Sequence, residues 1–412
     1  MKKIRLLFFI LLLHLIAFTQ ERSLDFYIRA GIENSPFLKD LKNQQRANTI
    51  DSMRILAGYL PQVNAVSTNS YAPTVGGWGY DGAITNGSNF SQLVSVSKQL
   101  VSKENLKNQH EAIQLLNESL KTSGKISEQD LRKTITAQYI SAFGNYQQYY
   151  FNKEVLQLFK KEQTILKSLT EKGVYRQTDY LSFLVTMQQQ EIQITLYKNI
   201  FQNDFSSLNY LCGINDTSAV PLKKPEIFLS LLPEAENSIF YQQFLNDSLK
   251  LRNSDALIDY RYKPKVNVYG DGGYLTSFSG QAYKNFGVSL GLNLVVPIYD
   301  GKQKKMQHDK IEIAEQSRKQ YRDYFKTQYS QQIAQLFQQL HAAEDLVHQS
   351  ENQIKYVETL IEANQKLLET GDAHMADYII AIGNYMNAKN TITLNRISQL
   401  QIINQINYWN RK

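Results

Sequence analysis

The feature that most restricts the fold of this chain is an internal duplication. Short anchor segments of the first half return in the same order in the second half, about 200 residues later. The anchors are 59–65 with 262–268, 89–90 with 285–286, and 171–173 with 369–371. Each of the last two triplets is followed by Asp-Tyr at the same spacing. We therefore expect two tandem copies of one structural plan rather than several unrelated domains.

The N-terminus has the pattern of a secretory signal peptide. Lys2, Lys3 and Arg5 precede an apolar run at 6–18, and polar residues follow that run. A buried N-terminal helix is the alternative, but no neighbouring segment shares this polarity. The predicted organisation is a signal peptide at 1–19, a first repeat at 20–215, a linker at 216–235 and a second repeat at 236–412.

The composition excludes two classes of protein. A mean hydropathy of −0.40 leaves no room for several transmembrane helices, each of which needs roughly 20 mostly apolar residues. The net charge of +7 is spread along the chain without a run of five like charges, so nothing favours nucleic-acid binding. Cys212 is the only cysteine, and an intrachain disulfide is therefore impossible.

Each repeat contains two segments with the alternating pattern of a β-strand. In the clearest one, Val288, Leu290 and Leu292 alternate with small or polar residues. One apolar face over about 9–11 residues is typical of a transmembrane β-strand, although a half-buried strand of a soluble sheet has the same pattern. The predicted strands are about 63–71, 90–100, 265–274 and 285–296. The glycine-rich runs 76–79 and 270–273 are interpreted as turns rather than phosphate-binding loops.

Aromatic residues are abundant near these strands, with 26 Tyr and 19 Phe in the chain. They suit either a core or the belt that a barrel places at the lipid headgroups. Four strands cannot close a barrel, since even small barrels need about 8. If the strands cross a membrane, several chains must share one barrel.

Two stretches of nearly 70 residues have the composition of very long helices. The stretch from Lys302 to Thr370 contains no Pro, and Gln, Lys, Glu, Ala and Leu dominate it. Gly173 and Gly371 stand where left-handed C-caps are expected, and a second helix follows each glycine. We therefore predict long helical hairpins at about 103–211 and 302–411. Their apolar seams are expected at Leu156, Phe159, Gln163 and Leu166, and at Ile354, Val357, Leu360, Ile361 and Leu367.

Duplication, strand pairs and long helical hairpins behind a signal peptide resemble the TolC family of outer-membrane efflux proteins. Residues 262–266 are similar to that family's Pro-x-Val start of a strand, and 296–302 to its Pro-aromatic-Asp-Gly turn from strand to helix. The turn residues are Pro297, Tyr299, Asp300 and Gly301. The first repeat departs from this motif at 99–103.

The resemblance implies a mostly α protein with a transmembrane β-barrel portion. Four strands from each chain of a homotrimer would close a 12-stranded barrel in the cell outer membrane, and the helices would form a tunnel into the periplasm. The implied function is passive export of small molecules or polypeptides, in a tripartite efflux pump or type I secretion system. The implied partners are a periplasmic adaptor protein, an inner-membrane transporter and outer-membrane lipid, with no cofactor and no metal.

The hairpin tips are the candidate functional residues. Asp179 and Asp377 each follow a tip glycine by six residues, the spacing at which the family narrows its tunnel. Capping of the returning helices is the alternative role for these aspartates. Gly173, Arg176, Gly371 and His374 are expected to contact the adaptor, and protonation of His374 could modulate an aspartate ring.

The tips also depart from the family. The second aspartate of its better-known members is replaced by Ile380, and the Arg and Tyr that fasten their closed state are replaced by Ala373 and Leu368. How the closed state of this chain is fastened is therefore not implied by the resemblance.

Catalysis has no motif in this sequence. The six histidines lack the spacing of a metalloprotease, and no serine nucleophile elbow or paired-carboxylate motif is present. The histidines are His14, His110, His308, His341, His348 and His374. We predict that the chain is not an enzyme. A secreted or cell-surface coiled-coil scaffold or adhesin without a pore is the competing hypothesis.

Overall fold

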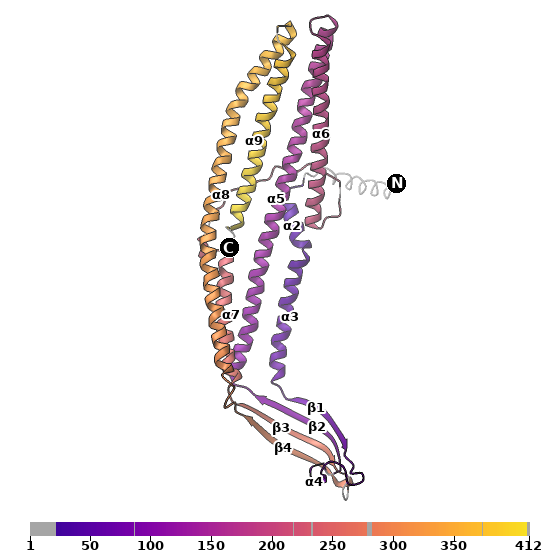
Figure 1. Ribbon diagram of the computed structural model, residues 1–412, viewed down its shortest axis with the longest axis vertical. Coiled ribbons are helices and arrows are strands. Elements are labelled where there is room, and N and C mark those ends of the chain that lie inside the picture. The colour runs from indigo at the N-terminus through magenta and orange to yellow at the C-terminus, as the bar shows by residue number, and fades with distance from the viewer. Residues whose placement is uncertain are drawn as a thin grey trace, which may run out of the picture. The chain divides into compact units, whose positions relative to one another are not determined.

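A computed structural model describes residues 22–85, 87–216, 218–231, 234–277, 282–372 and 374–409 (Figure 1). The predicted signal peptide lies outside these ranges. The described chain is mostly helical and contains one four-stranded antiparallel sheet, which confirms the predicted fold class of long helical hairpins plus four strands. Within these residues, no helix combines the length and the hydrophobicity needed to cross a lipid bilayer.

The elements run in nearly the same order in the two halves of the chain. The first half contains α2 (Leu24–Asn34), α3 (Pro36–Gly58), β1 (Gln62–Tyr71), β2 (Ser88–Leu100), α5 (Lys103–Glu171) and α6 (Gln177–Cys212). The second half contains α7 (Ile239–Arg261), β3 (Lys265–Thr276), β4 (Phe286–Val295), α8 (Gln303–Thr370) and α9 (Met375–Trp409). In the described part of the connections, three short helices occur: α4 (Gly82–Thr85), η2 (Ala235–Asn237) and η3 (Ala282–Lys284).

By packing, the chain divides into two compact units. The hairpin unit takes the described parts of Met1–Lys39, Gly124–Ile239 and Phe325–Lys412, and the sheet unit takes those of Asp40–Ser123 and Phe240–Tyr324. Each unit draws on both halves of the chain. The long helices α5 and α8 belong partly to each unit. The two units therefore do not correspond to the two sequence repeats.

The sheet unit has two chemically different strand faces. The order of the strands is β1-β2-β3-β4, and every neighbouring pair is antiparallel. One row across the sheet joins Val63, Val96, Gly270 and Leu290, and the next row joins Asn64, Ser95, Asp271 and Ser289. Because successive side chains point to opposite faces, the first row belongs to an apolar face and the second to a polar one.

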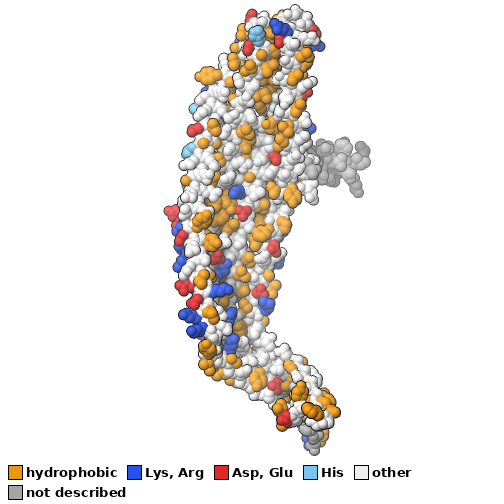
Figure 2. All heavy atoms as spheres, in the orientation of Figure 1, with side chains coloured by type: hydrophobic (Ala, Val, Ile, Leu, Met, Phe, Trp, Pro, Cys, Tyr) orange, Lys and Arg blue, Asp and Glu red, His pale blue; other side chains and the backbone are white. Residues whose placement is uncertain are grey.

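The apolar strand face is exposed to solvent in the single chain. Its exposed members include Val63, Val94, Val96, Val288, Leu290, Leu292 and Leu294. Leu290, in the edge strand β4, is 90% exposed. Hydrophobic side chains are accordingly visible over the strands at the lower end of the space-filling view (Figure 2).

The glycine run at 270–273 is not a turn, and that interpretation of the sequence was wrong. All four residues lie inside β3. Gly273 has a φ of 153°, and a Cβ atom there would stand 2.1 Å from the backbone carbonyl oxygen of Gln92 on β2. The glycines therefore permit close approach of strands rather than chain reversal. The other run does contain a turn, at Gly76 and Gly77.

Asp300 caps the N-terminal end of the long helix α8, which follows β4. Its Oδ1 accepts a hydrogen bond from the backbone N–H of Lys302 at 2.9 Å, and its Oδ2 accepts one from Lys304 at 2.6 Å. Gly301 and Lys302 both have a φ of 67°. Pro297, which lacks an N–H, follows the end of β4. In the predicted Pro-aromatic-Asp-Gly turn, Pro297 thus follows the end of the strand, Asp300 accepts backbone hydrogen bonds at the start of the helix, and Gly301 has a left-handed backbone conformation.

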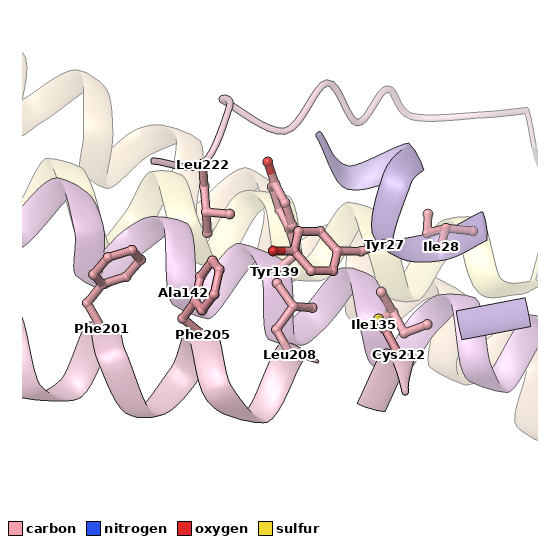
Figure 3. Packing of buried hydrophobic residues seen from close by; sticks show 10 residues of the cluster. All are labelled: Tyr27, Ile28, Ile135, Tyr139, Ala142, Phe201, Phe205, Leu208, Cys212 and Leu222. Atoms are coloured by element: carbon pink, nitrogen blue, oxygen red, sulfur yellow. The ribbon is translucent and has the colours of Figure 1, made fainter. Parts of the chain in front are cut away.

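The largest core cluster of the hairpin unit joins α2, α5, α6 and the linker (Figure 3). Its central aromatic residues, Tyr27, Tyr139 and Phe205, are fully buried. The Tyr139 hydroxyl lies within hydrogen-bonding distance of two backbone carbonyl oxygens, of Arg22 at 2.9 Å and of Lys223 at 2.7 Å, and its single proton serves one or the other. One side chain on α5 therefore contacts two separate chain segments. Burial raises the pKa of the Cys212 thiol to about 12.

The predicted helix seams are confirmed in part, because Phe159, Leu166, Ile354 and Val357 are buried. On α5, Val155 is buried with Phe159 and Leu166, whereas Leu156 is only half-buried. On α8, Leu368 is buried, while Leu360 and Leu367 are exposed. The buried cluster contains residues of all four helices α5, α6, α8 and α9. Each long helix thus packs against more than its own return helix, and its buried surface includes residues outside the seam predicted for two helices.

The glycines of the sheet provide a matched test of this packing. Gly273 and Gly287 are direct partners across β3 and β4, but a Cβ atom at Gly287 would meet nothing within 4 Å. Gly273→Ala is expected to lower the free energy of unfolding by about 2–3 kcal/mol, because it forces a Cβ atom against the backbone of β2. Gly287→Ala should change it by less than about 0.5 kcal/mol. Thermal unfolding of the purified variants measures both, and equal effects would contradict the observed register.

Candidate functional site

The turn after each long helix is closed by the same backbone motif. After α5, the N–H of Gly173 donates to the carbonyl oxygen of Thr170, and that of Val174 to Leu169, both at 3.0 Å. Gly173 has a φ of 78°. These are the two bonds of a Schellman motif, in which a left-handed residue satisfies the last helical carbonyl groups. The conformation favours Gly because it has no Cβ atom.

The turn after α8 repeats this geometry. The N–H of Gly371 donates to Leu368 at 3.2 Å, and that of Asp372 to Leu367 at 2.9 Å. Gly371 has a φ of 82°. The repeated Glu-x-Gly triplet of the sequence therefore marks two equivalent helix ends.

The two predicted aspartates occupy equivalent places beyond these turns. Asp179 is the third residue of α6, and Asp377 is the third residue of α9. Their backbone N–H groups donate to the carbonyl oxygens of Arg176 and His374, both at 3.1 Å. At α6 the cap position is Arg176, and no side chain makes the capping bond. A carboxylate in the first turn is still favoured by the positive end of the helix dipole.

The two carboxylates differ in exposure. Asp377 is exposed to solvent and Asp179 is half-buried. Neither carboxylate makes an ion pair with Arg176 or His374 among the residues that the structure describes. In the described part of the chain, each basic candidate is thus joined to its aspartate by a backbone hydrogen bond and not by an ion pair.

The residues that replace the family's fastening positions have different surroundings. Leu368 is fully buried in the cluster between the hairpins, and Ile380 is exposed. Ala373 lies outside the described residues.

One contact between the two hairpin turns was missed by sequence reasoning. The Tyr175 hydroxyl, on the turn after α5, donates to the backbone carbonyl oxygen of Leu368 on α8 at 3.0 Å. A Cβ atom on Gly371 would stand 2.9 Å from Cγ1 of Val174, so the turns also touch directly. Burial raises the pKa of Tyr175, and nearby Asp372 adds to this effect. A tyrosine two residues after the turn glycine was the only sequence signal for this contact.

A second missed contact places a carboxyl group inside the hairpin packing. Glu162 on α5 is 4% exposed, and Nε2 of Gln365 on α8 donates to its Oε1 at 2.8 Å. Burial raises the pKa of this carboxyl; Lys161 opposes the shift, whereas Glu369 adds to it. The pKa of Tyr378 on α9 is also raised, by burial and by the proximity of Glu162. In the sequence, this contact was signalled only by the position of Glu162 between Phe159 and Leu166, on the apolar stripe of the helix.

The turn from β4 to α8 continues the exposed apolar surface of the sheet unit. Ile298 and Tyr299 are both largely exposed, and Tyr299 is 83% exposed. Asp300 is occupied by the helix-capping bonds described above. Of the predicted turn residues, only Tyr299 therefore has a large side chain available for contact with lipid or another chain.

Solved structures of outer-membrane proteins have a fold similar to this combination of long paired helices and a four-stranded sheet. CusC, described with conformational changes that accompany transmembrane channel formation, matches with a TM-score of 0.77 and 12% identity over 96% of this chain and 94% of its own. The outer membrane protein VceC of Vibrio cholerae matches with a TM-score of 0.76 and 12% identity over 94% of this chain and 96% of its own.

The MtrE outer membrane channel of Neisseria gonorrhoeae, in its open state, matches with a TM-score of 0.75 and 11% identity over 94% of this chain and 88% of its own. No family model and no curated protein matches this sequence. The predicted resemblance to the TolC family is therefore confirmed at the level of the fold, over nearly the whole chain.

The buried carboxyl of Glu162 makes the hairpin packing dependent on pH. Its pKa in the folded chain is above the unfolded value, so its favourable contribution is complete below the unfolded pKa and is lost as the pH rises through the folded pKa. Glu162→Gln keeps the shape without the charge. We expect the Tm of this variant to equal that of the wild type near pH 4 and to exceed it increasingly towards pH 8.

Glu171→Gln is the matched control, because Glu171 is exposed at the end of the same helix. Its Tm should differ little from the wild type at either pH. A Glu162→Gln variant with the same pH dependence as the wild type would show that Glu162 is not the group responsible.

Proposed function

We propose that this protein is a trimeric outer-membrane channel that continues as a tunnel into the periplasm. In this proposal it exports solutes or polypeptides passively, in series with a periplasmic adaptor and an inner-membrane transporter. The observation that carries the proposal is an amphipathic four-stranded sheet whose two edge strands lack a partner within the described chain. The similarity of its fold to outer-membrane channels supports the same conclusion.

The sheet edges explain why several chains are needed. β1 and β4 each offer a row of backbone N–H and C=O groups, and in lipid such groups must be paired. Four strands cannot close on themselves, whereas three copies supply 12 strands, which is enough for a barrel with a lumen. In that barrel β4 of one chain pairs with β1 of the next.

The two faces of the sheet match the two environments of a barrel wall. The face with Val63, Val96 and Leu290 suits lipid, and the face with Asn64, Ser95 and Ser289 suits a water-filled lumen. A soluble sheet would have covered its apolar face with another element. Among the described elements no helix does so, since these side chains are largely exposed.

At the other functional region, the hairpin turns are the proposed periplasmic end. Three copies of Asp377, with Asp179 nearby, would form a carboxylate ring that narrows the tunnel and favours cations. Gly173, Arg176, Gly371 and His374 are the proposed adaptor contacts. The Tyr175 and Glu162 contacts hold the two hairpins of one chain together, so separating the turns requires breaking both.

The direct test is reconstitution of the full-length protein. We expect it to fractionate with the outer membrane, to form a detergent-stable trimer and to conduct ions across a planar lipid bilayer. The competing hypothesis of a secreted scaffold or adhesin predicts a protein that high salt releases and that conducts nothing. That second result would contradict the proposal.

The proposed ring makes a separate prediction at Asp377. Asp377→Ala should raise conductance or lower cation preference, because it removes three charges from the narrowest part of the tunnel. Thermal stability should fall by no more than about 1 kcal/mol, the scale of a helix-dipole interaction. A loss of stability with unchanged conductance and ion preference would assign Asp377 to helix stabilisation alone.

A further inference from the structure

Asp271 lies in the middle of β3 on the polar strand face, within the run 270–273 that the sequence had suggested was a turn. We propose that Asp271 sets the charge selectivity of the barrel lumen, by placing a ring of three carboxylates inside the sheet. This inference rests on the proposed function and adds a selectivity-determining residue separate from the hairpin turns.

The strand register fixes the place of Asp271. It is paired with Ser95 on β2 and with Ser289 on β4, and Ser95 is paired in turn with Asn64 on β1. All four side chains of this row therefore share the polar face. If that face lines the lumen, the row becomes a continuous polar belt with one carboxylate in each chain.

Within its own row the carboxylate has small neighbours, Ser95 and Ser289, while the larger Tyr269 and Leu93 lie on the same face one step away along their strands. Asp271 is half-buried in the single chain, and the Ser289 hydroxyl donates to its Oδ2 at 2.8 Å. Two residues farther along β3, the same face has Gly273 paired with Gly287 on β4. The serine orients the carboxylate, while the glycines add no side chain that would cover it.

Asp271 is also the only acidic residue on the polar strand face within the described strands. By alternation, the other charged residue on this face is Lys265, at the start of β3. Six residues of strand separate them, or roughly 20 Å at about 3.3 Å per residue. This is more than twice the Debye length of about 8 Å at physiological salt, so Lys265 does not neutralise Asp271.

A carboxylate ring in a pore with a low-dielectric wall attracts cations and repels anions. The effect adds to any selectivity at the periplasmic turns, because an ion must pass both places in series. The two can be separated by substituting one at a time.

The experiment measures the reversal potential of the reconstituted full-length channel under a KCl gradient. The wild type should prefer K⁺ to Cl⁻, and Asp271→Asn should lower the permeability ratio about twofold or more while the channel continues to conduct. The control is Asp81→Asn, which changes an exposed carboxylate in the loop between β1 and β2 and should leave the ratio unchanged.

Conversely, Ser95→Asp adds a second carboxylate to the same row and should raise the ratio. If the Asp271→Asn variant fails to assemble, the permeability ratio of the Ser95→Asp channel still tests whether carboxylates in this row affect ion selectivity. Conducting Asp271→Asn and Ser95→Asp channels with the wild-type ratio would overturn the role of Asp271 and leave the channel itself established. A wild-type protein that assembles in the membrane but conducts nothing would overturn the proposed function and this inference together.

Discussion

The pairing of backbone groups at the two edges of the sheet is the constraint on which the proposed assembly depends. A chain that contributes only four strands leaves β1 and β4 open, and lipid offers no hydrogen bonds to open edges. In the proposed barrel, association of identical chains would pair both edges at once, and the membrane would cover the apolar face. The mild mean hydropathy is compatible with this arrangement, since the strands are a small part of the chain and only one residue in two of each needs to be apolar.

The long helices have a different requirement. Each helix of nearly 70 residues must end, and the chain must then reverse its direction. Glycines in the left-handed conformation close both long helices with the same two backbone bonds. At the start of α8, the two oxygens of Asp300 receive two backbone N–H groups. Beyond these local devices, contacts between hairpins depend on residues far apart in the chain, such as Glu162 with Gln365.

Much of the fold could be predicted from the sequence because its signals are local. Period-two alternation predicted the strands, the absence of Pro predicted the long helices, and glycines predicted the helix ends. What failed depended on long-range packing. The seams of α5 and α8 were only partly correct because each helix packs against several partners, and 270–273 was interpreted as a turn because Asp-Gly also suits a turn.

The candidate site was predictable only in part. The equivalent positions of Asp179 and Asp377 followed from duplication, but their proposed ring requires three chains. Tyr175 and Glu162 escaped notice, and Asp271 was assigned to a turn, because the partner of each residue lies on another element: a carbonyl oxygen, an amide and a serine. No spacing within one segment could reveal such partners.

Spin labels on adjacent residues of β4 would show whether one face of the sheet meets lipid and the other meets water. Leu292 is on the apolar face and Asn293 on the polar face, and both are exposed. Single-cysteine labels in the reconstituted protein would be compared by collision with oxygen, which concentrates in lipid, and with a water-soluble nickel chelate. The account predicts that the label at 292 collides mainly with oxygen and the label at 293 with nickel. Equal access of nickel to both labels would contradict it.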